Sequence, residues 1–393
     1  FLGYPSAFTI YDQSDSVSAI KACIKELQLD DKVYKPKDVL SRISGAKNNL
    51  VTCDRYATRE ELLAGDRRAQ RGRLHEVYRL YQQKLKTSGV MDFDDILVNM
   101  NILLRDNPEA LHALAARFDY IMVDEYQDTN YSQYVILKKL ASIKRNICVV
   151  GDDSQSIYAF RGAKIENILN FRKDYPDCKI VRLERNYRST RIIVDAANSV
   201  IAHNEGRIPK ACYSEGDAGE KIKVLNCMTD AEESALVVQE IVDRVRSKGA
   251  QYRDFAILYR TNSQSRSLEE TLRRRNIPYM IYSGNSFFER AEVKDLMAWF
   301  KLSVNTNDDE SFKRAIGKPA RGIGDTTLAV LETFARQKGL SMFRAVYAEE
   351  LPGVLREAAI RRLREFCALV SGFAGAALTQ DAASLTRRIA DES

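Results

Sequence analysis

The chain changes its pattern of apolar residues along its length, and this change limits the folds that it can adopt. In residues 14–87, apolar side chains recur every three or four positions, as on one face of a helix. Between residues 118 and 261, short β-rich runs alternate with helical stretches, which is typical of parallel strands joined by crossover helices. Helical periodicity returns after residue 287. The sequence therefore predicts an α/β protein in which helical sections flank the part that forms the sheet.

Five short runs are the candidate strands of the α/β section, at residues 120–124, 146–151, 179–183, 222–226 and 255–259. A polar stretch with two glycines, residues 213–220, is predicted to be a loop within this section. Single hydrophobic cores stop growing at about 250 to 300 residues. A chain of 393 residues is therefore expected to form two or more packed units.

Composition excludes several classes of protein. No apolar run approaches the roughly 20 residues that span a bilayer, so no membrane partner is expected. The seven cysteines show no Cys-x-x-Cys pairing and the three histidines lie far apart, which supports neither a zinc site nor a disulfide framework. An odd number of scattered thiols fits a reducing cytosol, and we expect a cytoplasmic protein.

The charge of the chain permits a nucleic-acid partner without requiring one. The net charge of +6 is a modest excess for this length. Basic side chains do gather locally, and each cluster is either a nucleic-acid contact or a solvated helix face. The clusters consist of Arg67, Arg68, Arg71 and Arg73, of Arg273, Arg274 and Arg275, and of Arg361, Arg362 and Arg364.

Two adjacent acids, Asp124 and Glu125, follow the first candidate strand. Ligand sites in open α/β sheets form at the carboxyl ends of the strands, and two carboxylates there favour a hard cation. In nucleotide-hydrolysing enzymes the first acid at such a place holds Mg²⁺, and a neighbouring acid orients or deprotonates the attacking water. The alternative is a strand that simply ends in solvated acids.

The second candidate strand leads into a segment, residues 151–162, that is rich in groups able to contact phosphate, water and metal. The amide of Gln155 can hold a water molecule and sense a γ-phosphate together. Tyr158 and Phe160 lie two positions apart with Arg161 beside them, a combination that suits the faces of unpaired bases. The same aromatic side chains could instead fill a core.

A third polar segment, residues 184–190, contains Tyr187 and Arg188. The tyrosine can stack on adenine, and the arginine can reach a γ-phosphate and neutralise charge in the transition state. The structural alternative, which is compatible with this role, is a helix start capped by the side chain of Ser189 or Thr190.

In this order and spacing, the three segments resemble those of the superfamily 1A DNA helicases of the UvrD/Rep type. Residues 123–129 resemble the Walker B segment of the family, and further agreement comes from residues 8–12, 91–95, 258–262 and 287–295. The resemblance implies RecA-like parallel-sheet motor domains, 1A and 2A, each with an inserted helical subdomain, 1B or 2B, and ATP between the motors. The implied assignment is 1–13 as a remnant of 1A, 14–89 as 1B, 90–177 as 1A, 178–286 as 2A and 287–393 as 2B.

The same resemblance implies a role for individual residues. Asp124 would coordinate Mg²⁺, Glu125 would activate water, and Gln155 would couple the γ-phosphate to the DNA site. Tyr187 would stack on adenine, and Arg188 would be the arginine finger. The implied contacts with single-stranded DNA are Phe93, Tyr158, Phe160 (where the family usually has tryptophan), Arg161, Arg260 and Asn262.

A turn at Gly322 and Gly324 resembles the duplex-contacting turn of subdomain 2B, where backbone N–H groups at a helix N-terminus approach a phosphate. The partners implied are therefore single-stranded DNA and junctions of single- and double-stranded DNA. The implied activity is an ATP-dependent helicase with 3′ to 5′ polarity that acts in repair or replication.

One motif of the family, the phosphate loop Gly-x-x-x-x-Gly-Lys-Ser/Thr, is not found in the sequence. Gly317 and Lys318 are followed by Pro319 and lack the upstream glycine and the hydroxyl. Because the chain also begins with Phe1, we expect it to be an internal piece of a longer protein. Without the lysine and its backbone cradle, the 393-residue chain alone is expected to hydrolyse little or no ATP.

The sequence leaves two other functions open. The chain could be a non-catalytic scaffold that binds single-stranded DNA, although such a protein has no physical need for a set of phosphoryl-transfer residues. It could also belong to the helicase subunit of a helicase–nuclease complex.

Overall fold

The computed structural model describes residues 1–282 and 290–393, which form two compact units. The first unit contains Phe1–Ile180, Gly206–Ile208 and Lys294–Ser393. The second contains the described residues of Val181–Glu205 and Pro209–Val293. Among the described residues, no helix is long and apolar enough to cross a membrane.

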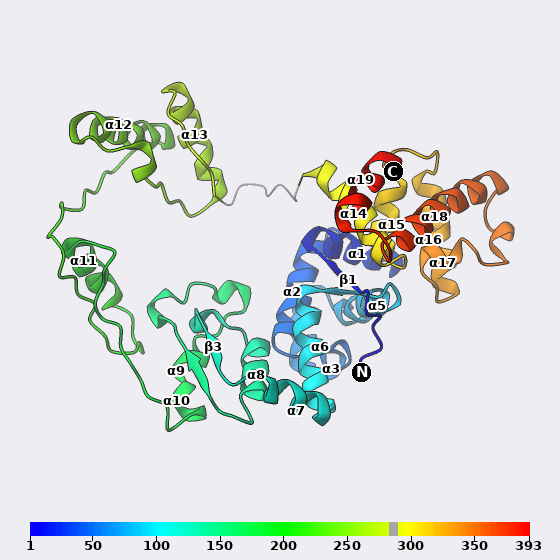
Figure 1. Cartoon of the computed structure of the whole chain (residues 1–393), viewed down its shortest axis with the longest axis horizontal. Helices are drawn as coiled ribbons and strands as arrows, with labels where there is room; N and C mark the ends of the chain where they lie inside the picture. Colours follow the sequence, from blue (N-terminus) through cyan, green and yellow to red (C-terminus); the bar gives the residue numbers. More distant parts are fainter. Residues whose placement is uncertain (283–289) are drawn as a thin grey trace. The chain divides into compact units, whose positions relative to one another are not determined.

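The first unit begins with a short strand and a group of helices (Figure 1). These are β1 (Thr9–Tyr11), α1 (Gln13–Glu26), α2 (Pro36–Asn48), α3 (Cys53–Thr58), α4 (Glu60–Arg68) and α5 (Leu74–Thr87). Asp12 and Asp15 form a capping box that starts α1, and Pro36 starts α2. The helices bury one face each around a core that includes Ile20, Tyr56 and Tyr81. The predicted helical section is therefore confirmed.

The next elements place the two candidate strands beside each other. They are β2 (Val90–Asp92), α6 (Phe93–Asp106), α7 (Pro108–Arg117), β3 (Ile121–Val123), α8 (Tyr131–Leu140), β4 (Ile147–Val149), α9 (Glu166–Leu169) and α10 (Phe171–Asp174). β3 pairs with β4 in parallel, with Ile121 opposite Ile147, and α8 makes the crossover. The strands predicted at 120–124 and 146–151 are confirmed in shorter form.

A second parallel pair was not predicted. β1 pairs with β2 over three residues each, with Thr9 opposite Val90. Such short strands carry almost no periodic signal in the sequence, and their partners lie far apart along the chain. The pairing brings the start of the chain against the segment that leads into α6.

The second unit contains α11 (Arg191–Ile201), α12 (Asp230–Lys248) and α13 (Ser265–Arg274). Its small core is formed by Val238, Val242, Leu272 and Ile277, with Ile257 packed against it. The predicted loop at 213–220 is confirmed as non-helical chain with one isolated bridge, between Arg185 and Tyr213.

The strands predicted at 179–183, 222–226 and 255–259 are wrong for this structure, because these segments have no strand assignment. A strand exists only through hydrogen bonds to a neighbouring strand, and β propensity does not supply that neighbour. The apolar side chains of these segments, among them Leu183, Val224 and Leu258, are exposed. Within residues 1–282 and 290–393, the predicted α/β class is thus supported by two short parallel pairs in a mostly helical structure.

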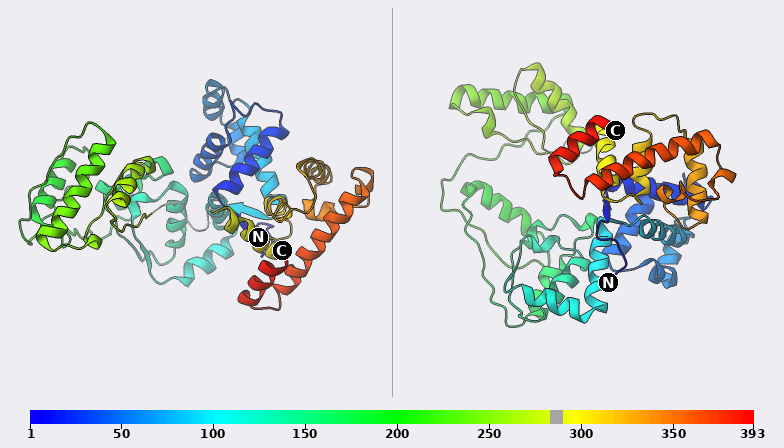
Figure 2. Two further views of the ribbon diagram at one scale, coloured as in Figure 1. Left: turned by 90° about the horizontal axis from the view of Figure 1, so that it is seen from above. Right: turned by 45° about the vertical axis from the view of Figure 1, so that its right-hand side comes forward.

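The C-terminal part of the chain is helical, as the sequence predicts; residues 287–289, where that prediction begins, lie outside the described residues. The helices are α14 (Ala291–Val304), α15 (Asp309–Ile316), α16 (Asp325–Gln337), α17 (Met342–Ala345), α18 (Glu357–Ala376) and α19 (Ala382–Glu392). α18 is the long orange helix of Figure 2. The core is aromatic: the ring centroids of Trp299 and Phe366 are 5.3 Å apart, and those of Phe312 and Phe366 are 5.1 Å apart.

The N-terminal and C-terminal parts of the first unit are joined by buried polar contacts. Thr9 Oγ1 donates to Asp308 Oδ2 at 2.9 Å, and Asn305 Nδ2 donates to the carbonyl oxygen of Ser88 at 2.9 Å. At the edge of the contact, Lys301 Nζ lies 2.6 Å from Asp15 Oδ2. Side chains nearly three hundred residues apart therefore satisfy one another in the interior.

Candidate functional site

The two acids directly follow β3, whose end lies beside the end of β4 in the parallel pair. Asp124 and Glu125 are exposed there. The backbone of Glu125 is left-handed, with φ of 49°, and its N–H donates to Asp124 Oδ1 at 2.9 Å. A left-handed backbone is uncommon for a residue other than glycine and is found preferentially at functional turns. The chain thus turns sharply at the point where it exposes two carboxylates.

A buried glutamine connects this turn to the end of β4. Gln127 is only 1% exposed, and its Nε2 donates to Glu125 Oε2 at 2.7 Å. Its Oε1 accepts the N–H of Asp152 at 3.0 Å. Gln155, whose Nε2 donates to Asp152 Oδ2 at 2.9 Å, continues the path. Three of the predicted site residues, Asp124, Glu125 and Gln155, are therefore brought together on one set of hydrogen bonds.

Gln127 was not among the predicted site residues. Its signal in the sequence is weak: an amide two positions after an acid pair, with nothing to indicate burial. The structure adds a second requirement, because a Cβ at Gly151 would lie 2.5 Å from Gln127 Oε1 and 2.9 Å from Ile168 Cδ1. Only glycine at this strand end leaves room for the bridging amide.

The aromatic pair after β4 is on the surface and not in the core. Phe160 is 69% exposed, and its ring centroid lies 6.0 Å from that of Tyr158. The guanidinium carbon of Arg161 lies 5.4 Å from the centre of the Tyr158 ring and 5.5 Å from that of Phe160. Exposed ring faces beside a cation are suited to stacking with unpaired bases.

Phe93 is the first residue of α6 and is 64% exposed. The helix begins with a capping box in which Asp92 accepts the N–H of Asp95 at 2.7 Å and Asp95 accepts that of Asp92. The exposed ring therefore projects from a helix end at which the capping box satisfies the amides of Asp92 and Asp95.

In the second unit, Tyr187 is 82% exposed and Arg188 is exposed beside it. The guanidinium carbon of Arg185 lies 4.7 Å from the centre of the Tyr187 ring. Asn186 Oδ1 accepts the backbone N–H groups of Arg188 and Ser189, which fixes the turn. One short ordered segment thus exposes an aromatic ring, with Arg185 over it, and the neighbouring cation of Arg188.

The expected side-chain cap of the following helix is wrong. Thr190 occupies the N-cap position of α11, but its side chain makes no capping hydrogen bond. The first amides of α11 are satisfied by the loop at 213–220: Arg191 N–H donates to the carbonyl of Asp217, and Ile192 N–H to that of Ala218, both at 3.1 Å. The loop thus takes the place of a side-chain cap at two of the first amides of α11.

Two other predicted DNA contacts, Arg260 and Asn262, are exposed in the second unit. They flank Thr261, which forms a capping box with Gln264 at the start of the short 3-10 helix Asn262–Gln264, directly before α13. In the first unit, Gly322 has φ of +67°, and its carbonyl accepts Arg362 Nη1 at 2.8 Å. Gly324 is the N-cap of α16.

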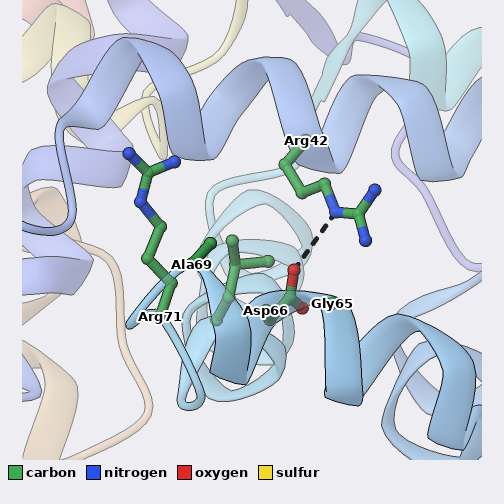
Figure 3. Close-up of a pocket in the computed structure, with 6 residues that line it drawn as sticks. Arg42, Gly65, Asp66, Ala69 and Arg71 are labelled. Carbon is green, nitrogen blue, oxygen red and sulfur yellow. Dashed lines mark hydrogen bonds and ion pairs between the residues drawn. The ribbon is translucent and has the colours of Figure 1, made fainter.

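Several arginines of the sequence clusters are engaged in ion pairs. Arg71 Nη2 lies 2.8 Å from Asp38 Oδ2, and Arg73 Nη2 lies 2.7 Å from Glu76 Oε2. Arg71 also lines a pocket of about 310 Å³ together with Arg42 and Asp66. Figure 3 shows Arg42 directed at Asp66, with Nε 3.2 Å from Oδ1. Acids balance both cations, so this pocket offers no unpaired positive site for an anion.

The described residues contain no group of three or more histidine, cysteine, aspartate or glutamate side chains that could hold a metal ion by itself. Asp124 and Glu125 nevertheless fit Mg²⁺, because protein sites commonly bind this ion through one or two carboxylates together with substrate phosphates. Both side chains are exposed at a strand end, where a nucleotide could approach.

Comparison with known proteins gives the family. The sequence model of the UvrD/REP helicase N-terminal domain matches residues 2–176, and that of the UvrD-like helicase C-terminal domain matches residues 181–351. The chain belongs to the UvrD/REP helicase family. Its relatives include proteins named ATP-dependent DNA helicase PcrA, 43% identical in Staphylococcus epidermidis and 42% identical in Staphylococcus aureus, over 91% of this chain in each case. The chain spans 48% of the length of these UvrD/REP helicases, about half.

Proposed function

We propose that the chain is part of the motor of an ATP-dependent DNA helicase that moves 3′ to 5′ on single-stranded DNA and unwinds duplex DNA. The observation that carries this proposal is the hydrogen-bonded path Glu125–Gln127–Asp152–Gln155 across the ends of two parallel strands. A protein that only binds DNA needs no such connection. The family match and the names of the helicase relatives support the same activity.

In this function, Asp124 would hold the Mg²⁺ that accompanies ATP, and the bound ion would supply charge neutralisation for phosphoryl transfer. Glu125 accepts a proton from the attacking water, since it is the next carboxylate and is oriented by Gln127. Gln155 contacts the γ-phosphate, and the hydrogen-bonded path connects this contact to Glu125. The aromatic turn, which consists of Tyr158, Phe160 and Arg161, begins three residues after Gln155, so the path and the proposed DNA contacts lie close together in the sequence.

The second unit supplies the remaining nucleotide contacts. Tyr187 stacks on adenine, and Arg188 neutralises charge that develops on the γ-phosphate. Support comes from their exposure and from the ordered turn that Asn186 makes. Both side chains are available without any rearrangement of the segment that carries them.

The architecture that we propose for this activity is RecA-like. Residues 1–13 and 90–177 belong to motor domain 1A, 14–89 to subdomain 1B, 178–286 to motor domain 2A and 287–393 to subdomain 2B; residues 283–289 lie outside the described part. The parallel β3–β4 pair with its crossover helix supports a parallel sheet in 1A.

The DNA partners follow from exposed side chains. Phe93, Tyr158, Phe160 and Arg161 contact single-stranded DNA from the first unit, and Arg260 and Asn262 do so from the second. The turn at Gly322 and Gly324 contacts duplex DNA at a junction through backbone N–H groups at the start of α16.

The test is a strand-displacement assay with the complete gene product. A labelled duplex with a 3′ single-stranded tail is expected to be unwound when ATP and Mg²⁺ are present, and a duplex with a 5′ tail or a blunt end far more slowly. Omitting Mg²⁺ or replacing ATP by a non-hydrolysable analogue provides the control. Equal unwinding of the two tailed duplexes would contradict the polarity, and no ATP-dependent unwinding of any substrate would contradict the proposed activity.

A further inference from the structure

A lysine is buried at the C-terminal end of α2. Lys47 is 1% exposed, and its Nζ lies 2.6 Å from Asp92 Oδ2 and 2.7 Å from Asp95 Oδ1. Tyr81 donates its hydroxyl to Asp92 Oδ2 at 2.9 Å. Burial alone would lower the pKa of Lys47, but Asp92 and Asp95 outweigh it and the pKa is raised. The ammonium group therefore stays charged in the interior, and its contacts with the two carboxylates fix its position.

The two carboxylates that hold Lys47 are the capping box of α6. Asp92 precedes Phe93 directly, and Asp95 is the third residue of the helix. Each also accepts a backbone N–H of the other, so both fix the backbone on either side of the exposed ring. Lys47 thus ties α2 to the residues from which Phe93 projects.

The next residue of α2 makes a second connection. Asn48 Nδ2 donates to Asp94 Oδ1 at 3.1 Å, and Asn48 Oδ1 accepts Asn130 Nδ2 at 2.6 Å. Asp94 follows Phe93 in the sequence, and Asn130 is the N-cap of α8, five residues after Glu125. One amide therefore joins the start of α6 to the loop that follows the two acids.

The same loop is held against the aromatic turn. Asn130 bridges to Ala163, and Lys164 N–H donates to the carbonyl of Thr129 at 2.9 Å. Asn167 Nδ2 donates to the carbonyl and to the hydroxyl of Thr129, both at 3.0 Å. The route from Asn48 through Asn130 thus reaches the segment that directly follows Tyr158, Phe160 and Arg161.

We propose that Lys47 and Asn48 form a polar clamp, called here the α2 clamp. It holds Phe93 and the aromatic turn in fixed positions relative to the two acids. Neither residue belongs to the exposed surface, so both are positioning residues and contact neither DNA nor nucleotide. The inference rests on the proposed role of Phe93 and the aromatic turn in binding single-stranded DNA.

The polar and charged character of the α2 clamp favours a role in positioning Phe93 and the aromatic turn. Burying an ion pair rarely stabilises a protein more than apolar side chains of the same volume would. What charges and amides add is direction, because each hydrogen bond is satisfied in one geometry only. In the α2 clamp, a lysine and the asparagine that follows it form hydrogen bonds to the residues on both sides of one exposed phenylalanine. This arrangement suits a positioning role.

The decisive variant is Asn48→Ala, with Asn49→Ala as the matched control. Asn49 is exposed and adjacent, and its side chain donates to the carbonyl of Gly45 in its own helix. The affinity of the complete gene product for a fluorescein-labelled oligothymidine is measured by anisotropy, and folding is checked by thermal unfolding. We expect Asn48→Ala to weaken binding roughly fivefold, as the loss of a buried hydrogen-bond pair would, and Asn49→Ala to leave it unchanged.

The same measurement in a Phe93→Ala background separates positioning from general stability. If the clamp acts through Phe93, Asn48→Ala adds little to the loss already caused by Phe93→Ala, whereas independent effects multiply. The triple variant K47M/D92N/D95N removes the buried charges together and is expected to behave like Asn48→Ala, even if it is less stable.

Each outcome has a distinct meaning. A fivefold loss in both backgrounds would overturn the α2 clamp and leave the role of Phe93 standing. No loss of affinity in Phe93→Ala itself would overturn both the clamp and the proposed DNA contact of this residue. A loss in the wild-type background that disappears in Phe93→Ala supports the clamp.

Discussion

The side-chain amide of Gln127 donates a hydrogen bond of 2.7 Å to Oε2 of Glu125. The same side chain accepts the N–H of Asp152 from the neighbouring strand end. An amide that is hydrogen-bonded to both a carboxylate and the adjacent loop can orient that carboxylate as a general base. It can also shift the carboxylate when a ligand binds to the loop.

Replacing Gln127 should slow ATP hydrolysis without preventing ATP binding. In Gln127→Ala, Glu125 loses the hydrogen bond that orients it, and general-base catalysis depends on that orientation. We expect kcat of the complete gene product to fall at least about tenfold, with a much smaller change in KM. Gln239→Ala is the control, because this half-buried glutamine of α12 bonds Asp243 and Arg275 in the second unit and has no proposed role in catalysis. An unchanged kcat in Gln127→Ala would remove the amide from the mechanism.

Adding one methyl group at Gly151 should disturb the same bridge. The Cβ of Gly151→Ala would lie 2.5 Å from Gln127 Oε1 and 3.2 Å from the backbone nitrogen of Tyr126, so the loop must shift. We expect a loss of about 1–3 kcal/mol in the free energy of unfolding and a reduced kcat. Gly45→Ala, in the interior of α2 with nothing within 4 Å of its Cβ, should instead be neutral or stabilising. Urea unfolding compares the two, and equal stability would contradict the crowding.

Removing the ring of Phe160 should weaken binding to single-stranded DNA. Stacking of one base on an exposed aromatic side chain contributes about 1–3 kcal/mol, so Phe160→Ala should raise the Kd for an oligothymidine roughly tenfold. Tyr347→Ala, an exposed aromatic residue outside the proposed track, should leave the Kd unchanged. Equal effects of the two substitutions would argue against a specific aromatic track.

The stability of the protein should fall as the pH rises through the range in which Asp309 titrates. Burial raises the pKa of Asp309 to about 7, while the N–H of Met342 and the charge of Lys313 oppose the shift; nearby Asp308 and Glu310 add to it. The unfolded chain releases this proton near pH 4. Between about pH 4 and 7 the folded state binds the proton that the unfolded state has lost, so rising pH removes stability.

Asp309→Asn isolates this contribution. The amide keeps an oxygen to accept the N–H of Met342, a contact of 2.8 Å in the wild type, but it does not titrate. Urea unfolding at pH 4.5 and at pH 7 should show the variant gaining stability relative to wild type as the pH rises. The exposed Asp31→Asn should show no such gain. Parallel pH profiles for wild type and Asp309→Asn would rule out the raised pKa.

The sequence was sufficient where the signal is local. An apolar run that ends in two acids predicted β3 and the position of Asp124 and Glu125, and the alternation of apolar side chains predicted the helices. It failed for the strands at 222–226 and 255–259, because their composition describes the residues and not the neighbour that each strand needs. It also missed Gln127 and Lys47. Nothing in the sequence shows that an ordinary amide or lysine is 1% exposed, since their burial arises from segments far away in the chain.

The most direct test of the motor is phosphate release by the complete gene product, with and without single-stranded DNA, in wild type and in Glu125→Gln. The substitution keeps the size of the side chain and removes its ability to accept a proton. We predict DNA-stimulated release in wild type and almost none in Glu125→Gln, with nucleotide binding retained. DNA-stimulated release at the wild-type rate in Glu125→Gln would contradict the account.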